Sequence, residues 1–321
     1  MYQAKGNPLR RLLRTITSAL ATTAILLAIA WPGAAQAPTP ATAHKQAPQT
    51  QAATRNEQSY AYGSHVRQKL DAYWYSSSTT QPAVVILHGG YWYEDTSWVT
   101  WSRYFTDHGY AAFSADYRLD FDAGWPAQRT DALAAIDYVK AHATTFDIDP
   151  NRIIVLGSSA GGHLATVVGT YGAAGARVKG IVALSPVASP YRAWNDGNHE
   201  DSTAAERKLR DNAAILARCY PDPDDLDTTM HPSCWDTWKD MVAKNRASGA
   251  DDAPMYLIHS ENDFVPVTHS TDLETAEETA HDMPSNGITV QTVPGSSAHG
   301  GALLDEPGII DSILTWMNQH V

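Results

Sequence analysis

The chain has few cysteines, few basic residues and few phenylalanines, and each shortage narrows what it can be. Only two cysteines occur in 321 residues, and they form no C-x-x-C pair, which argues against a thiol redox motif. Lys and Arg number 23 against 35 Asp and Glu, giving a net charge of −12. Nucleic-acid binding is therefore not expected, because phosphate contacts need clustered basic side chains. The chain has five phenylalanines against ten tryptophans and fifteen tyrosines. This composition favours partly solvated aromatic surfaces, such as the walls of a pocket, over a purely apolar core.

The N-terminal apolar segment, residues 16–31, is too short to span a membrane. It falls short of the ~20 residues that a transmembrane helix needs, and two threonines interrupt it. Four basic residues and no acidic residue precede it, and A-x-A patterns follow at 35–37 and 41–43. This order is typical of a secretory signal peptide. We expect residues 1–37 to be removed and the protein to be secreted, with an uncleaved membrane anchor as the less favoured alternative.

The details of export stay open, and a linker is expected after the signal. Pro38 would follow a cut after Ala37, which favours the later site, and Arg10-Arg11 hints at twin-arginine export. Residues 38–58 are rich in Ala, Pro, Thr and Gln and have no hydrophobic period, so they predict a flexible linker. The folded domain is expected at residues 59–321.

Short apolar runs alternate with helical patterns through this domain. The runs, each typical of a buried parallel strand, are 83–87, 111–117, 152–156, 178–184, 255–258 and 288–293. Apolar spacing predicts helices around 132–143 and after Pro307. The alternation predicts an α/β fold, a mostly parallel sheet with helices on both faces. Residues 187–253 break it, and we expect a cap inserted over the carboxyl ends of the strands.

A serine between glycines follows the predicted strand at 152–156. Residues 157–161 read Gly-Ser-Ser-Ala-Gly and open an Ala- and Gly-rich helix, which is the G-x-S-x-G nucleophile elbow in its required context. The glycines let the backbone crowd around a serine in a strained turn, so that its hydroxyl projects at the start of the helix. The register makes Ser159 the predicted nucleophile. A helix N-cap serine is the alternative.

His-Gly-Gly-Tyr-Trp at residues 88–92 ends an earlier predicted strand. Glycines here allow backbone N–H groups to point at a developing oxyanion. Gly90, Tyr91 and Ala160 are the predicted donors. An ordinary glycine turn is the alternative, but it leaves the His-Gly-Gly spacing after a buried strand unexplained.

A catalytic triad would be completed in the chain order serine, acid, histidine. Asp263 follows the predicted strand at 255–258, and His299 lies in a small-residue loop between the last predicted strand and the last helix. We expect His299 to be the general base toward Ser159, and Asp263 to orient its imidazole. Glu261 is the rival acid; Asp263 is favoured by its place before a Val-Pro pair.

Aromatic residues near these motifs are candidates for contacting substrate. We call the segment 88–92 the oxyanion loop. Trp92 ends this loop and Trp194 opens the predicted cap, so both are predicted to bind substrate. Packing of the loop against the cap explains them equally well. His163 follows the elbow by four residues and is predicted to be a packing residue of its helix.

Cys219 and Cys234 are predicted to form a disulfide. Both lie beyond the signal segment, in a chain expected to reach an oxidising compartment. The segment around them is rich in proline and aspartate and has little to bury, so a covalent bridge would offset its weak core. Two free buried thiols are the alternative.

Taken together, these motifs resemble a secreted α/β-hydrolase of the hormone-sensitive-lipase and feruloyl/acetyl-esterase-like branch. The likeness extends from about residue 60 to the C-terminus, and it is strongest at 88–92 and at 157–165. The resemblance implies the α/β-hydrolase fold with a cap and serine-esterase chemistry. One departure is that Tyr91-Trp92 follow two glycines where the lipase branch commonly has three. That form resembles small carboxylesterases and kynurenine-formamidase-like enzymes.

The expected function is therefore hydrolysis of carboxylic esters through a Ser-His-Asp triad and an acyl-enzyme. The substrate is expected to be a neutral ester, small or borne on a polymer, since the acidic chain repels anions. No metal or organic cofactor is expected, because no ligand-spaced cluster appears, and no stable membrane anchor is expected. A formamidase- or peptidase-like amide hydrolase is the main alternative. A non-enzymatic binding protein and an acyltransferase are less favoured.

Overall fold

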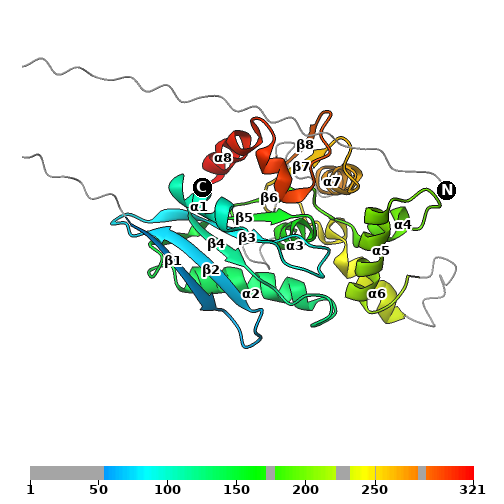
Figure 1. Cartoon of the computed structure of the whole chain (residues 1–321), viewed down its shortest axis with the longest axis horizontal. Helices are drawn as coiled ribbons and strands as arrows, with labels where there is room; N and C mark the ends of the chain where they lie inside the picture. Colours follow the sequence, from blue (N-terminus) through cyan, green and yellow to red (C-terminus); the bar gives the residue numbers. More distant parts are fainter. Residues whose placement is uncertain (1–53, 171–177, 222–231, 250, 281–286) are drawn as a thin grey trace, which may run out of the picture. The chain divides into compact units, whose positions relative to one another are not determined.

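The computed structural model describes residues 54–170, 178–221, 232–249, 251–280 and 287–321. Within these residues, eight strands form one sheet in the order β1-β2-β4-β3-β5-β6-β7-β8 (Figure 1). The first two pairs, β1 with β2 and β2 with β4, are antiparallel, and the other neighbours are parallel. The strands are β1 (Arg55–Ala61), β2 (Lys69–Tyr75), β3 (Gln81–Leu87), β4 (Ala111–Ala115), β5 (Ile148–Ser158), β6 (Gly180–Leu184), β7 (Met255–Ser260) and β8 (Ile288–Val293).

The six apolar runs correspond to β3–β8, while the antiparallel strands β1 and β2 were not expected. β1 begins at Arg55, inside the segment 38–58 that was expected to be a linker, so the folded part of the chain starts before residue 59. β1 is a polar edge strand with no hydrophobic period, and what holds it is non-local. It pairs along its length with β2, and Arg55 forms an ion pair with Asp107 at 2.6 Å. Such contacts leave no local signal in the sequence.

Helices cover both faces of the sheet, as the alternation predicts. The helices that cover the two faces are α1 (Val99–Asp107), α2 (Ala127–Ala141), α3 (Ala160–Gly169), α7 (Thr268–Thr275) and α8 (Ile309–His320). Alternate residues of β3 face opposite sides. Val85 and Leu87 share a core with α2, α3 and α7, and Val84 and Ile86 share another with α1 and α8. Both faces are therefore dry, which is why the parallel strands are continuous apolar runs.

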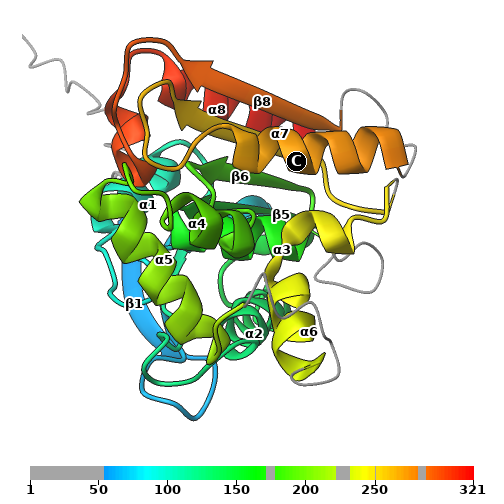
Figure 2. The same ribbon diagram turned by 90° about the vertical axis from the view of Figure 1, so that its right-hand side faces the viewer.

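The segment 187–253 forms a helical subdomain, which we call the cap. It contains α4 (Pro190–Asp196), α5 (Ala204–Ala217), α6 (Pro232–Met241) and the short η2 (Ala243–Arg246), and in Figure 2 its helices lie in front of the sheet. Its apolar core includes Leu209 and Trp238 and continues into Trp92, Ala160 and Val265. Those three residues follow β3, β5 and β7. The cap thus packs at the carboxyl ends of the strands.

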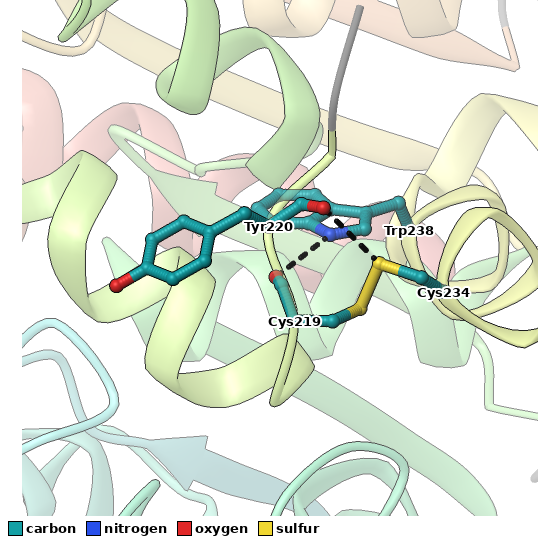
Figure 3. Close-up of a disulfide and its surroundings, with 4 residues drawn as sticks. All are labelled: Cys219, Tyr220, Cys234 and Trp238. Carbon is teal, nitrogen blue, oxygen red and sulfur yellow. Dashed lines mark hydrogen bonds between the residues drawn. A yellow bond between two sulfur atoms is a disulfide. The ribbon is translucent and has the colours of Figure 1, made fainter. Parts of the chain in front are cut away.

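A disulfide joins Cys219, just after α5, to Cys234 of α6 (Figure 3). The Trp238 indole N–H donates to the carbonyl oxygen of Cys219 at 3.2 Å. Cys234 Sγ lies 3.4 Å from the carbonyl oxygen of Tyr220, a contact without a proton, because a bridged sulfur has none. The predicted disulfide is confirmed, and it links two of the cap helices.

The expected signal peptide, residues 1–37, lies outside the described residues, as does nearly all of the expected linker. In the part of the chain that the structure describes, no helix combines the length and the apolar character needed to cross a bilayer.

Candidate active site

Ser159 lies at a sharp turn between β5 and α3, and sterics explain the glycines around it. Its φ of +53° is in the left-handed region, which a non-glycine residue enters at a cost. Its N–H donates to the Leu184 carbonyl of β6 at 2.8 Å, which holds the turn to the sheet. A Cβ at Gly157 would collide with the Gly161 carbonyl, and one at Gly161 would collide with the Leu87 carbonyl of β3. The glycines therefore allow the helix to begin close against the sheet.

The structure brings Ser159, His299 and Asp263 together from three strand ends. His299 Nε2 lies 2.8 Å from Ser159 Oγ, and His299 Nδ1 lies 2.8 Å and 3.1 Å from the two carboxylate oxygens of Asp263. Because the carboxylate accepts only, Nδ1 carries the proton and Nε2 is left to accept from the serine hydroxyl. The Asp263 side chain is fully buried, whereas the His299 side chain is 26% exposed. This arrangement can remove a proton from the serine.

The rival acid, Glu261, lies elsewhere. It is exposed, and its carboxylate accepts the backbone N–H of Gly295 at 2.6 Å. Asp263 is the carboxylate that contacts the imidazole, and one of its oxygens also accepts the Val265 N–H at 3.1 Å. The geometry therefore favours Asp263, as the sequence did.

Three backbone N–H groups near Ser159 are free to receive a negative charge. Within the described residues, the N–H groups of Gly90, Tyr91 and Ala160 donate no hydrogen bond to the backbone or to the Ser159 side chain. Ala160 opens α3, so its N–H also lies at the positive end of a helix. Gly90 has φ +113°, and a Cβ there would collide with the Glu94 carbonyl, so this position requires glycine. These are the donors that the sequence predicted, and their role in catalysis stays a proposal.

A cavity of about 410 Å³ opens over Ser159 and His299. Trp98 and Trp101 from the start of α1 line it, with Ala302 and Asp305 from η4 (Gly300–Asp305). The two tryptophans were not predicted, although their spacing of three residues soon after the oxyanion loop was a usable signal.

Trp92 and Trp194 were predicted to bind substrate, but neither lines this cavity. Tyr91 and Trp92 have φ of +57° and +59°, and this turn buries the Trp92 ring completely under the loop. There its indole N–H donates to His163 Nδ1 at 3.1 Å. Trp194 packs within the cap against Tyr220 and Trp238, with ring centroids 5.5 Å and 6.0 Å away. Both tryptophans therefore pack within the protein, which is the alternative role that the sequence allows.

An aromatic stack connects the oxyanion loop, His299 and the cap. The Phe264 ring lies 4.2 Å from the His299 ring and 6.0 Å from the Tyr91 ring, measured between centroids. From α5, Lys208 Nζ lies 4.3 Å above the Tyr91 ring and 3.1 Å from a Glu94 carboxylate oxygen. The cap therefore supplies one cation to the rim of the cavity.

Buried histidines around the site are neutral. Burial lowers the pKa of both His163 and His259 to about 4, and it also lowers the pKa of His88. His88 stacks on Tyr117 and donates to the Gly89 carbonyl at 2.7 Å, so it holds its own loop. Across the described residues, no three His, Cys, Asp or Glu side chains are grouped as metal ligands would be.

The mostly parallel sheet, with a strand–turn–helix serine at its centre, defines an α/β-hydrolase. Solved structures agree. The acetyl ester-xyloside bifunctional hydrolase from Caldicellulosiruptor lactoaceticus has a TM-score of 0.61 and 26% identity, covering 78% of this chain and 87% of that one. Esterase B from Lactobacillus rhamnosis has a TM-score of 0.64 and 21% identity, covering 83% of this chain and 85% of that one. At this identity the similarity supports the fold alone.

Sequence comparison narrows the class. Residues 70–185 match the model of the BD-FAE family. Esterase LipC of Mycobacterium tuberculosis is 33% identical over 114 residues, which are 34% of this chain and 28% of LipC. Lipase 2 of a Moraxella species is 31% identical over 137 residues, 42% of this chain and 28% of that protein. The chain thus spans under a third of the length of these relatives. The chain thus has the α/β-hydrolase fold and is similar in sequence to esterases.

Proposed function

We propose that this protein is a secreted serine hydrolase that cleaves carboxylic esters through an acyl-enzyme. The observation that carries the proposal is the hydrogen-bonded series Ser159–His299–Asp263, open to a cavity beside three free backbone N–H groups. The names of the relatives, an esterase and a lipase, support ester substrates. The disulfide and the N-terminal segment support export.

Each group has one role in the proposed mechanism. Ser159 Oγ attacks the acyl carbon while His299 Nε2 takes its proton, and Asp263 stabilises the imidazolium that forms. The oxyanion lodges on the N–H groups of the oxyanion loop and of Ala160. The imidazolium then protonates the leaving alcohol, and a water molecule activated by His299 releases the acid.

The shape of the cavity supports short or flat acyl groups. Its volume of about 410 Å³ suits a small ester, and two indole rings supply flat apolar walls. One structural neighbour is described as an acetyl ester-xyloside bifunctional hydrolase. Another, esterase B, is described with a tributyrin phosphonate inhibitor. Both descriptions point to short acyl groups. We therefore propose acetyl or other short-chain esters, free or carried on a neutral polymer.

Replacing the nucleophile tests the proposal. Ser159→Ala should lower kcat on p-nitrophenyl acetate by roughly 10⁴–10⁶-fold, because the nucleophile of a triad is lost. It should also abolish labelling by a fluorophosphonate probe. Ser312→Ala, at an exposed serine on α8, is the matched control and should behave as the wild type. A Ser159→Ala protein that keeps most of its turnover contradicts the assignment.

A substrate panel separates esters from amides. We expect p-nitrophenyl esters to be cleaved fastest with short acyl chains, alongside acetylated sugars and feruloyl esters. N-formylkynurenine and peptide amides complete the panel. Faster turnover of an amide than of any ester favours the formamidase- or peptidase-like alternative. A preference for long-chain triglycerides contradicts the short-chain proposal.

A further inference from the structure

The two loops that carry the proposed acid and base meet at a buried serine, Ser185, which directly follows β6. Its hydroxyl lies 2.5 Å from Asp263 Oδ2 and 3.0 Å from the backbone nitrogen of Gly300. The partners decide the direction of both hydrogen bonds. The Gly300 N–H can only donate, so the Ser185 oxygen accepts it, and the hydroxyl proton is left for the carboxylate.

The backbone holds this hydroxyl in place. Ser185 is fully buried and has φ +46°, a left-handed conformation that costs free energy for any residue but glycine. Its N–H donates to the Ile258 carbonyl of β7 at 2.7 Å. Gly300 has φ +57°, and a Cβ there would lie 2.5 Å from Ser158 Oγ, so the loop after His299 depends on glycine. Two unusual backbone conformations thus meet at one hydroxyl.

We propose that Ser185 is a positioning residue for the reaction, which holds the Asp263 carboxylate toward His299 and ties the His299 loop to it. The inference rests on the proposed function. Without Ser185, the donors that remain to Asp263 among the described residues are the Val265 N–H and His299 Nδ1. One donor fewer leaves the carboxylate both freer to rotate and more strongly attracted to the imidazolium.

Ser158, at the end of β5, offers a matched control because it contacts the same loop after His299. Its hydroxyl oxygen accepts the N–H of Gly301 at 2.9 Å, so it ties the loop one residue beyond the Ser185 contact. In the described part of the chain, no hydrogen bond joins Ser158 to Asp263. Ser158→Ala therefore removes a loop contact and leaves the carboxylate untouched.

Other charged and titratable groups near His299 stay the same in these variants. Among the described residues they include His259 from β7, Glu94 just after the oxyanion loop, Lys208 from α5 and Asp305 from η4. His259 is buried, with both ring nitrogens bonded to Val265 and Ser270, and it is neutral near pH 7. A change confined to the Ser185 variants is thus traced to the Asp263 hydrogen bond.

The first experiment needs no substrate. The ring of His299 is titrated by NMR in the full-length wild type, Ser185→Ala, Ser185→Gly and Ser158→Ala proteins, with its resonances assigned by comparison with His299→Gln. We expect the titration midpoint to move to higher pH by about half a unit or more in both Ser185 variants. It should not move in Ser158→Ala. Ser185→Gly accepts the positive φ without strain, so it keeps the fold should Ser185→Ala be unstable.

The second experiment measures activity on p-nitrophenyl acetate. Ser185→Ala should lower kcat roughly ten- to a hundredfold with KM near the wild-type value, the effect of one hydrogen bond to a charged group. The acid limb of its pH profile should move to higher pH. In an Asp263→Asn background the same substitution should change kcat little, because its target is gone.

Three results overturn the inference: unchanged midpoints in both Ser185 variants, the same shift in Ser158→Ala, or an equal loss of kcat with and without the Asp263 carboxylate. The titration decides even if esters are not the substrate. A wild type that cleaves no ester, or a Ser159→Ala protein that does, overturns the proposed function alone.

Discussion

At the scale of single residues, His163 connects three parts of the site. Its Nδ1 accepts the Trp92 indole N–H, which only donates, so Nε2 carries the proton and donates to the Met241 carbonyl at 2.7 Å. The residue lies on α3, one turn after Ser159, whose carbonyl accepts the His163 N–H at 2.9 Å. A neutral ring thus links α3, the oxyanion loop and the cap.

This ring makes folding sensitive to acid. Burial lowers the folded pKa of His163 to about 4, below the ~6.5 of an unfolded histidine. Between these values the unfolded chain binds more protons, so stability falls as the pH drops from about 6.5 toward 4. From pH 7 to pH 5, the wild type should lose on the order of 1–2 kcal/mol more unfolding free energy than His163→Gln.

Urea melts at the two pH values measure this difference. His108→Gln, at an exposed histidine of the α1 C-terminus, is the control and should lose as much as the wild type. Equal losses in the wild type and in His163→Gln would show that the ring is protonated in the folded state.

At the scale of elements, the cap is built differently from the sheet it covers. The cap helices share a small apolar core. At the rim of the cavity, Lys208 of the cap forms an ion pair with the Glu94 carboxylate. The disulfide joins two cysteines that are 15 positions apart in the chain, one just after α5 and the other in α6. Ser159, Asp263 and His299, by contrast, all follow strands of the sheet.

Removing the disulfide should therefore weaken the cap more than the triad. In the chain-entropy model, Cys219→Ala/Cys234→Ala costs about 3 kcal/mol for a loop of this length. We expect thermal unfolding at a lower temperature and a rise in KM that exceeds the fall in kcat. Dithiothreitol should reproduce these changes in the wild type and have no effect on the double variant. A loss of kcat with KM unchanged would place the cap in the chemical step instead.

At the scale of the whole molecule, negative charge dominates. The net charge is −12, and two carboxylates, Glu94 and Asp305, line the cavity with Lys208 paired to one of them. Such a field lowers the local concentration of anionic substrates and leaves neutral ones unaffected.

Substrate charge should consequently control kcat/KM. The p-nitrophenyl ester of methyl succinate should have a higher kcat/KM than the p-nitrophenyl ester with a free succinate carboxylate. The ratio of the two kcat/KM values should fall as added salt shortens the Debye length below the ~10 Å reached at 0.1 M. Asp305→Asn should raise kcat/KM for the anionic ester only. A salt-independent ratio, or an equal gain for both esters, would mean that charge at the rim does not select the substrate.

The sequence by itself determined the parallel strands β3–β8, the elbow and its serine, and the candidate acid and histidine. These signals are local: a strand buried on both faces is a continuous apolar run, and a tight strand–turn–helix admits only glycine at Gly157 and Gly161. The order of the three candidate triad residues along the chain follows from the order of the strands that carry them.

Only the tertiary structure decided the rest. The polar strand β1 exists through pairing with β2, and the Trp92 ring turns into the interior because two successive residues adopt positive φ. The contact of Ser185 with Asp263 joins residues 78 positions apart. In each case a side chain or strand is placed by backbone geometry and by partners distant in the chain, and neither leaves a periodic pattern in the sequence.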